Sequence, residues 1–285
     1  MNSSKRTYGT VIETETGRYI ARSRQDLVSR VLFTEGEWEP LLLGLAKEVV
    51  RDIPSTIVLD VGCNIGAFSV PMGDYLTNNG IIHAFDAQRT VFYQTCGACA
   101  LNGLDNVYLH NLAVGDRTGN IEVPLLDLAA TKSVGGLSLN PEYNRQRAHD
   151  FVFRNEVESV PIITLDTFLS PAQCDKVSLI KVDVEGFELE VFRGADKLLR
   201  SHYPALLFEA WEGLAWYGKK REELLQHVRA LGYLLTTVGE LILAQHPKSK
   251  ANLIKLESID GELRISRVRA AATTSQRATA SPVTA

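Results

Sequence analysis

The chain has 285 residues, 45% of them hydrophobic, which suffices for one large or two small domains with a sizeable core. Its net charge of -4 provides no overall basic field to hold nucleic acid, so DNA or RNA is not expected as a partner. The first ten residues are polar and no apolar run approaches the ~20 residues of a membrane span, so we expect a cytoplasmic protein without a membrane span.

Residues 1–34 are predicted to form an N-terminal extension. Alternating residues from Thr10 to Arg22, on either side of Thr16-Gly17, predict a β-hairpin that covers one edge of the fold. A helix should then run to Val50, because a proline suits the first helical turn and Pro40 stands there.

The stretch from Thr56 to Gly66, TIVLDVGCNIG, organises the rest of the chain. Its apolar, β-branched start predicts a strand buried on both faces of a parallel sheet. Asp60, Gly62, Asn64 and Gly66 then end the strand and cross a tight loop into a helix. A strand, a turn of small residues and a helix N-terminus together form a site for a nucleotide.

The spacing of these residues separates two classes of nucleotide. A dinucleotide site uses G-x-G-x-x-G, and the third glycine is missing here. The carboxylate of Asp60 at the strand end would repel a pyrophosphate and attract a cationic amino-acid group. S-adenosylmethionine (SAM) carries an ammonium and a sulfonium and no phosphate, so we predict SAM as the cofactor.

The next strand, residues 81–87, contains a second candidate cofactor residue. Asp86 follows Gly66 by 20 residues, the spacing at which nucleotide-binding α/β folds place an acid on the ribose hydroxyls. Ala87 comes directly after it. Ala113 lies just past the end of a third strand, where an adenine ring can enter.

Residues 125–158 break the α/β rhythm. They contain Gly135-Gly136, Pro141 and a polar run to His149, with little periodicity. A connection of this length is either functional or disordered. We interpret it as a substrate-facing insertion, with a solvated surface loop as the alternative.

Three carboxylates end two strands in the second half of the chain. The strand VSLIKVDVEG ends in Asp183 and Glu185, and PALLFEAWEG ends at Glu209. The carboxyl ends of parallel strands meet at one edge of the sheet, where α/β proteins bind their ligands. Since SAM is a methyl donor, we predict that Asp183 lies nearest the transferred methyl, and that Glu185 or Glu209 takes a proton from the acceptor or fixes the acceptor.

Other roles stay open for these carboxylates. Glu185 can cap the helix that follows, and Glu209 can pair with Lys181. All three can also hold Mg²⁺, which we place second because no further ligand is visible. Cys96 and Cys99 form a C-x-x-C without a second pair, so we assign no metal site.

The remaining segments complete the predicted sheet. Two strands joined through Gly239-Glu240 indicate a hairpin, so at least one strand should be antiparallel, and residues 251–257 should add another strand. The tail 266–285, rich in Ala, Thr, Ser and Arg, is predicted to be disordered.

Several segments together resemble the FkbM family of SAM-dependent methyltransferases: VLDVGCNIGAFSV, HAFDAQ, LNGLDNVYLHNLAVGD, VPIITLD and LIKVDVEGFELEVFRGA. The similarity spans roughly residues 35–209. It implies an α/β, Rossmann-like class I methyltransferase fold over residues 35–265, with a seven-stranded, mostly parallel sheet and helices on both faces. It also implies the strand order 3-2-1-4-5-7-6, with the seventh strand antiparallel.

The resemblance implies a SAM-dependent O-methyltransferase that acts on a hydroxyl group of a sugar, a glycan or a small natural product. Cys63 stands where the family commonly has Ala, and Asp86 replaces the commoner Glu. The family also places Trp38 and Glu37 over the cofactor. The expected cofactor-binding residues are Asp60, Gly62, Cys63, Asn64, Gly66, Asp86, Ala87, Ala113 and Asp183.

Three alternative functions fit parts of the pattern. A nucleic-acid methyltransferase would share the cofactor site, but would usually add an N-P-P-Y type loop, a catalytic Pro-Cys pair or a basic face. An NAD-dependent dehydrogenase is disfavoured by the missing third glycine. A non-catalytic nucleotide-binding module would keep the fold without the reaction.

Overall fold

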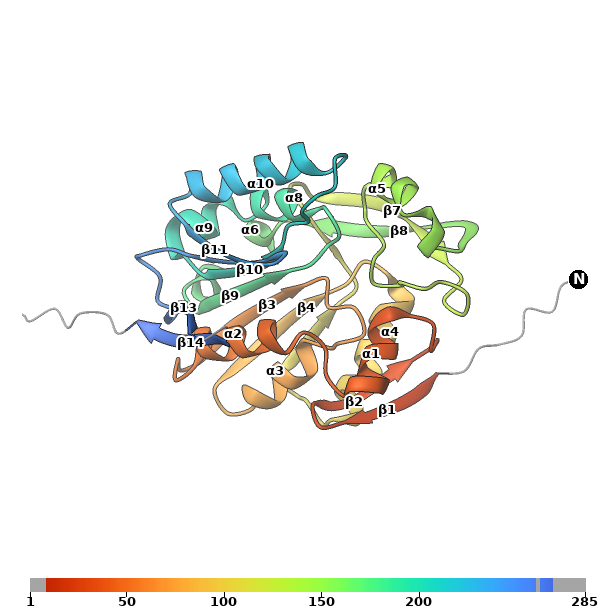
Figure 1. The fold of residues 1–285 in the computed structure, drawn as a ribbon, viewed down its shortest axis with the longest axis horizontal. Helices are drawn as coiled ribbons and strands as arrows, with labels where there is room; N and C mark the ends of the chain where they lie inside the picture. Colours follow the sequence, from red (N-terminus) through yellow and green to blue (C-terminus); the bar gives the residue numbers. More distant parts are fainter. Residues whose placement is uncertain (1–8, 260–261, 269–285) are drawn as a thin grey trace, which may run out of the picture.

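The computed structural model describes residues 9–259 and 262–268. Its central sheet has seven strands in the order β11-β12-β10-β9-β3-β4-β5, and only β12 runs antiparallel to its neighbours (Figure 1). The strands are β3 (Thr56–Val61), β4 (Gly80–Phe85), β5 (Val107–His110), β9 (Val177–Val182), β10 (Ala205–Glu209), β11 (Leu234–Val238) and β12 (Leu241–Gln245). This is the predicted order, with the predicted antiparallel strand.

Helices cover both faces of this sheet (Figure 1). Every residue of β3 and β9 is buried, as expected for apolar strands between two helical layers. Alternation along β3 sends Val58 into the core on one face and Leu59 into the core on the other. One face carries α2 (Pro40–Val50), α3 (Ser69–Tyr75) and α4 (Arg89–Leu101); the other carries α6 (Leu165–Phe168), α7 (Pro171–Cys174), α8 (Glu188–Arg193), α9 (Asp196–His202) and α10 (Gly218–Ala230).

The N-terminal hairpin forms as predicted, from β1 (Thr10–Thr14) and β2 (Gly17–Ala21). It packs against α4 rather than covering a sheet edge. The side chain of Asn102 accepts the N–H of Arg18 at 3.0 Å, and a Cβ on Gly97 would lie 2.3 Å from Ile20. Helix α1 (Leu27–Glu35), which we did not predict, follows with Asp26 as its N-cap.

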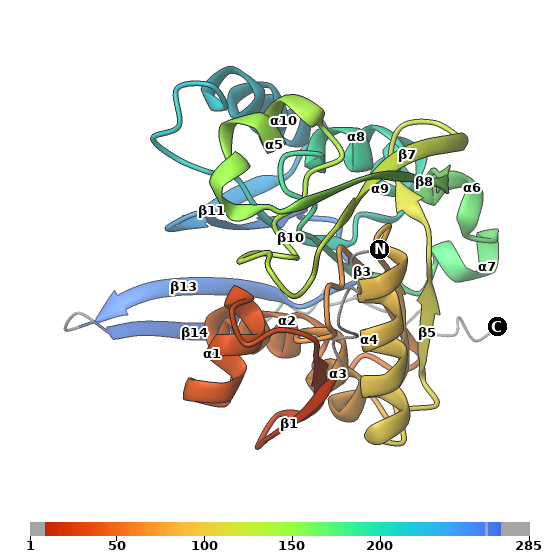
Figure 2. The same ribbon diagram turned by 90° about the vertical axis from the view of Figure 1, so that its right-hand side faces the viewer.

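Much of the predicted insertion is regular structure. β7 (Gly119–Leu126) and β8 (Phe153–Ile163) pair antiparallel, and β6 (Ala113–Val114) joins β8 to complete a three-stranded sheet (Figure 2). The sequence showed no strand at the start of β8 because its first five residues are all exposed, so they have no apolar alternation. Between these strands lie α5 (Pro141–Gln146) and the short helix η1 (Ala148–Asp150).

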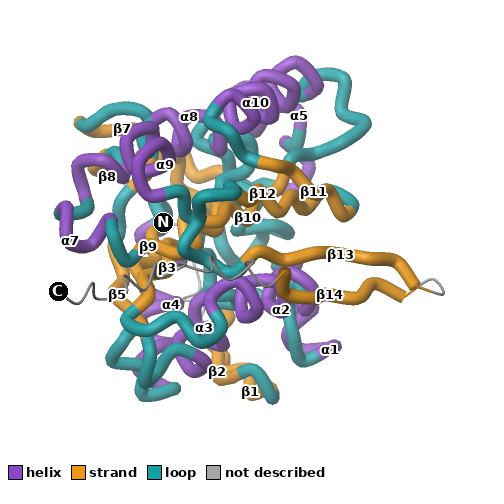
Figure 3. Tube along the Cα trace, turned by 90° about the vertical axis from the view of Figure 1, so that its left-hand side faces the viewer, coloured by secondary structure: helices purple, strands orange, loops and turns teal. Residues whose placement is uncertain are grey.

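The C-terminal strands differ from the prediction. β13 (Leu253–Ile259) pairs only with β14 (Glu262–Val268), as a separate hairpin beside α2 (Figure 3), so residues 251–257 do not join the central sheet. Residues 266–268 belong to β14, and the rest of the predicted tail, 269–285, lies outside the described residues. Within residues 9–259 and 262–268, no helix is long and apolar enough to cross a membrane.

Candidate active site

The loop after β3 is held in shape at the carboxyl edge of the sheet. The N–H groups of Gly62 and Cys63 both donate to the carbonyl of Phe85 at 3.0 Å, which ties the loop to β4. Gly62 has a φ of 84°, and a Cβ there would lie 1.8 Å from the carbonyl oxygen of Asp183. Glycine is therefore required, because the backbones that follow β3 and β9 approach too closely for a side chain.

Asn64 forms the middle of this loop and takes the left-handed conformation, with a φ of 47°. Its N–H donates to Asp86 at 3.0 Å, and its carbonyl accepts the hydroxyl of Thr95. Its side-chain Oδ1 is buried without a hydrogen-bond partner among the described residues, so it is available to a ligand. Gly66 packs against Thr95 instead of lining a cavity.

Asp60 lies beneath the loop, in the core. It accepts the hydroxyl of Ser69 at 2.5 Å and faces the Nζ of Lys181 at 3.2 Å. Lys181 also donates to the carbonyl of Gly62 at 2.9 Å and lies 3.4 Å from Asp183. Burial lowers the pKa of Lys181, but the negative charges of Asp60 and Asp183 outweigh it and raise the pKa above its ordinary value. Asp60 thus supports the loop and lines neither cavity of the site.

Asp86 ends β4 and faces a small cavity. Its two carboxylate oxygens accept the N–H groups of Asn64 at 3.0 Å and Gln88 at 2.8 Å. Burial raises the pKa of Asp86 to about 7, although both hydrogen bonds lower it. With Ala87 and Ala113, Asp86 lines a cavity of about 50 Å³ whose other walls include Leu112, Val114, Leu137 and Leu139. The predicted ribose and adenine contacts therefore lie side by side.

A larger cavity, of about 430 Å³, adjoins the first. Gly62, Asp86, Gly135 and Asp183 line both cavities. Of the predicted site residues, the large cavity is lined by Gly62, Cys63, Asn64, Asp86, Asp183, Glu185 and Glu209. Residues from the N-terminal extension and from the insertion complete its walls, among them Leu27, Val28, Ser133, Gly136 and Arg147.

Glu209 and Glu39 meet in this cavity. Glu209 ends β10, whereas Glu39 precedes α2 and has a φ of 47°. Their side chains are hydrogen-bonded to each other. Burial, followed by the negative charges of Asp183 and Glu39, raises the pKa of Glu209 to about 9. Lys181 pairs with two aspartates rather than with Glu209, so the proposed Lys181–Glu209 pair is wrong.

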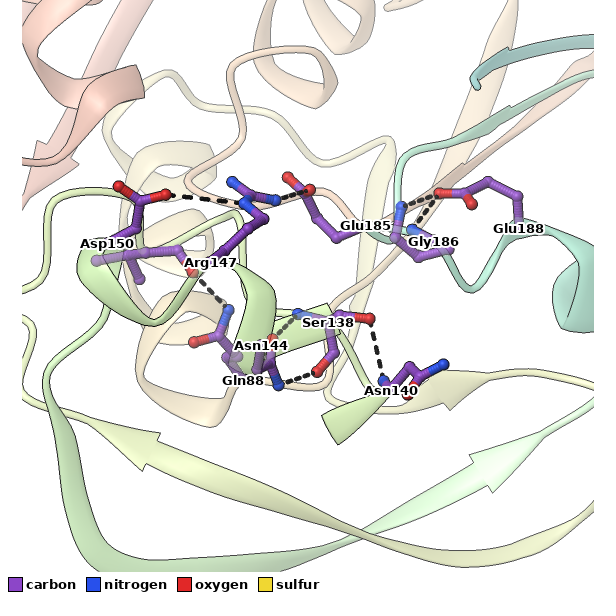
Figure 4. A network of polar contacts seen from close by, with 11 residues as sticks. Gln88, Ser138, Asn140, Asn144, Arg147, Asp150, Glu185, Gly186 and Glu188 are labelled. Carbon is purple, nitrogen blue, oxygen red and sulfur yellow. Dashed lines mark hydrogen bonds and ion pairs between the residues drawn. The ribbon is translucent and has the colours of Figure 1, made fainter. Parts of the chain in front are cut away.

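Glu185 lies in the turn after β9 and is paired with the insertion. Arg147 donates from Nη1 to Oε2 of Glu185 at 2.5 Å, and its Nε lies 3.8 Å from Asp150 (Figure 4). Burial and the negative charge of Asp183 raise the pKa of Glu185 to about 8, while Arg147 opposes the shift. The insertion is therefore anchored at the cavity by a half-buried ion pair.

Glu185 does not cap α8, whose N-cap is Phe187 without a side-chain capping bond; the Glu188 side chain instead bonds to the turn before the helix. Its Oε1 accepts the N–H of Val184 at 3.2 Å and the N–H of Gly186 at 3.1 Å (Figure 4). Burial raises the pKa of Glu188 to about 7 against these bonds. Glu188 therefore holds the turn that carries Glu185, which leaves the Glu185 side chain to the cavity.

An aromatic cluster packs against the turn that carries Glu185, where a Cβ on Gly186 would lie 2.3 Å from the ring of Tyr143. The ring centroid of Tyr143 lies 4.9 Å from that of Trp216, 5.9 Å from that of Tyr217 and 6.2 Å from that of Trp211. Tyr143 and Tyr217 are buried in the core, whereas Trp211 lines the cavity. The guanidinium of Arg147 lies 5.6 Å from the Trp211 ring centroid. Trp211 alone of these four is therefore placed to face a ligand.

The sequence pattern of the methyltransferase FkbM domain matches residues 60–235, which is more than half of the chain. The chain belongs to the FkbM methyltransferase family. The chain is therefore a SAM-dependent methyltransferase of this family.

The solved structures that resemble this chain have low sequence identity to it. The FkbM methyltransferase from Methylobacillus flagellatus KT is 15% identical, with a TM-score of 0.46 over 75% of this chain, and this chain covers only 50% of that protein. An rRNA methylase from Streptococcus thermophilus is 12% identical, with a TM-score of 0.41 over 73% of this chain and 97% of its own. M. jannaschii TYW2 in complex with AdoMet is 12% identical, with a TM-score of 0.37 and 84% of each chain covered. Among curated proteins, no sequence matches this chain.

Sequence reasoning did not place three charged residues, Glu39, Arg147 and Lys181, in the cavity wall, and considered Lys181 only as a partner of Glu209. Glu39 was overlooked in favour of Glu37, which is exposed and lies outside the cavity. Pro40 after Glu39 marked the helix start, but nothing local indicated that the side chain turns inward. Lys181 and Arg147 looked like ordinary strand and loop cations. Among the described residues, no group of three or more His, Cys, Asp or Glu side chains is placed to hold a metal ion.

Proposed function

We propose that this FkbM methyltransferase transfers the methyl group of SAM to a hydroxyl group of a sugar, a glycan or a small natural product. The junction of the two cavities supports this proposal. The small cavity at Asp86 and Ala113 continues past Gly62 and Asp183 into the large one, which carries carboxylates and Trp211. A hydroxyl acceptor needs such a base, because an alcohol is a poor nucleophile until its proton leaves.

The residues around the loop after β3 fit SAM. Asp86 would hold the ribose hydroxyls, and Ala87 and Ala113 would face the adenine in the small apolar cavity. Cys63 and Asn64 would face the methionine moiety, where the unpartnered Oδ1 of Asn64 can accept a hydrogen bond from the ammonium. SAM supplies an electrophilic methyl group at its sulfonium.

The cavity walls suit in-line transfer. Asp183 lines both cavities, so we assign it to the junction where the methyl group and the acceptor oxygen meet. Glu185 and Glu209 line the acceptor side, where one can take the proton and the other can bind the acceptor. Trp211 offers an apolar face on which a sugar or a macrocycle can lie. Alignment of this kind is worth up to about 7–11 kcal/mol of the barrier.

The test begins with calorimetry, in which SAM should bind and NADH should not. The protein is then incubated with SAM carrying a labelled methyl group and with a panel of alcohols, sugars and RNA, and label should appear on a hydroxyl group. Asp183→Asn and Glu209→Gln should each lower the transfer rate at least a hundredfold. Asp105→Asn, at an exposed position, is the control. Label on RNA, or on no alcohol, would refute the proposal.

A further inference from the structure

Glu39 and Glu209 are two cavity carboxylates that form no ion pair with any described cation. By contrast, Oδ2 of Asp183 lies 3.4 Å from Nζ of Lys181, and Oε2 of Glu185 lies 2.5 Å from Nη1 of Arg147. Glu39 and Glu209 instead hydrogen-bond to each other, although β10 and the turn before α2 are far apart in the sequence.

A hydrogen bond between two carboxyl groups requires a proton. An ionised carboxylate has acceptors only, so two ionised groups would repel each other. At short range, two carboxyl groups therefore share one proton and one negative charge. Burial raises the pKa of both groups, and the remaining charges that act on the pair are Asp183, Glu185 and Lys181. Of these three, Lys181 alone favours ionisation.

The backbone at Glu39 is shaped for this contact rather than for capping. Glu39 has a φ of 47°, in the left-handed region that non-glycine residues seldom adopt. Its side chain makes no capping hydrogen bond to α2, although it stands at the N-cap. Pro40 follows at the first helical position. The conformation instead places Glu39, with its neighbour Trp38, in the cavity wall. Strain of this kind persists where the surrounding structure imposes it, often at functional sites.

We propose that Glu39 and Glu209 form a proton-sharing pair that serves as the general base for methyl transfer, so that Glu39 is a catalytic residue of this chain. This inference rests on the proposed function and deepens it. The ionised member of the pair accepts the proton as the acceptor O–H bond breaks. The oxygen forms its bond to the methyl carbon while the S–CH₃ bond of SAM breaks, and that electron pair stays on sulfur.

The other carboxylates are less suited to this role. The carboxylate of Asp183 already faces the ammonium of Lys181 at 3.4 Å, and that of Glu185 already faces the guanidinium of Arg147 at 2.5 Å, so each is engaged in an ion pair. The Glu39–Glu209 pair lacks such a cation. After the reaction the pair holds two protons, and one is released to solvent before the next cycle.

The first test follows the proton directly by infrared spectroscopy. The C=O stretch of a protonated carboxylic acid is recorded against pH in the wild type, Glu39→Gln and the matched control Glu37→Gln. Subtracting the spectrum of Glu209→Gln isolates the Glu209 signal. In the wild type and in Glu37→Gln this signal should persist at neutral pH and titrate near pH 9. In Glu39→Gln it should titrate at lower pH, because a nearby negative charge is removed. An unchanged titration would overturn the pair.

The second test measures transfer. Glu39→Gln and Glu209→Gln should each lower kcat at least a hundredfold, with an unchanged Kd for SAM showing that both variants fold. The double variant should be no slower than the slower single variant, because the two groups act as one unit. Glu37→Gln should match the wild type. If the wild type methylates an alcohol and Glu39→Gln does so equally well, the role of the Glu39–Glu209 pair as the base is refuted, whereas the proposed function stands. Absence of transfer by the wild type to any alcohol would refute the proposed function and the base together.

Discussion

Replacing Lys181 with methionine tests whether the buried cation holds the site together. Methionine keeps a long unbranched side chain but removes an ammonium that is 2.9 Å from the carbonyl of Gly62, 3.2 Å from Asp60 and 3.4 Å from Asp183. The side chain of Asp60 has no exposed surface, and would keep only its hydrogen bond from Ser69. The variant therefore leaves a buried charge without a counterion.

Removing one partner of a buried ion pair costs about 3–5 kcal/mol. We therefore expect Lys181→Met to lower the folded-to-unfolded ratio by roughly two to four orders of magnitude, measured by urea unfolding. The double variant Asp60→Asn with Lys181→Met should recover part of this loss, because it removes the unpaired charge. The control is Lys176→Met, an exposed lysine one residue before β9, which should unfold like the wild type.

Two results would refute this reasoning. One is a loss below about 1 kcal/mol in Lys181→Met, which would mean that the ion pair contributes little beyond its desolvation cost. The other is a double variant less stable than Lys181→Met, which would mean that Asp60 stabilises the loop without Lys181.

Three further predictions concern the loop, the ribose contact and the insertion. Gly62→Ala should abolish SAM binding in calorimetry, because its Cβ would lie 1.8 Å from a carbonyl oxygen. In the control Gly36→Ala the new Cβ meets nothing within 4 Å, so this variant should bind SAM and lose only the ~1–2 kcal/mol of folding stability that a left-handed residue costs. Equal losses of SAM binding in the two variants would contradict this account. The affinity for SAM should fall as the pH drops through about 7, because protonated Asp86 accepts hydrogen bonds less well. The folding stability should instead rise as the pH drops over the same interval, because the pKa of Asp86 in the folded state lies above its ordinary value of 3.8. Asp86→Asn should flatten both profiles, and a pH-independent affinity in the wild type would speak against the ribose assignment. Arg147→Ala removes the ion pair that ties the insertion to Glu185. This variant should be cleaved faster within residues 127–152 by limited proteolysis, and should have a higher KM for the acceptor with an unchanged Kd for SAM. An unchanged cleavage rate would show that the ion pair does not anchor the insertion.

The strands and the nucleotide loop were predictable because their signals are local. The buried run before Asp60 predicted a strand buried on both faces, and β3 lies inside the sheet, between β9 and β4. The predicted tight loop forms, and Gly62 and Asn64 adopt the left-handed backbone that glycine and asparagine tolerate. The carboxylates at the strand ends were predicted to share one edge of the sheet, and Asp183 and Glu209 do line one cavity.

Partners that come from distant segments could not be predicted in this way. The structure pairs Arg147 of the insertion with Glu185, although nothing near Arg147 differs from an ordinary polar loop. Residues 251–257 were predicted to add one more strand to the sheet, yet as part of β13 they pair with β14 instead. Alternation alone cannot show which sheet a strand joins, because it reports burial and not the identity of the partner.

The sequence by itself determined the fold class, the family and the position of the loop at which we propose that SAM binds, because each depends on patterns within a few residues. Only the tertiary structure decided the charge state of the cavity. It brings Glu39 to Glu209, confines Lys181 between two aspartates and seats Arg147 on Glu185. Burial and neighbouring charges set the pKa of a carboxyl group, and both depend on which distant segments the fold brings together.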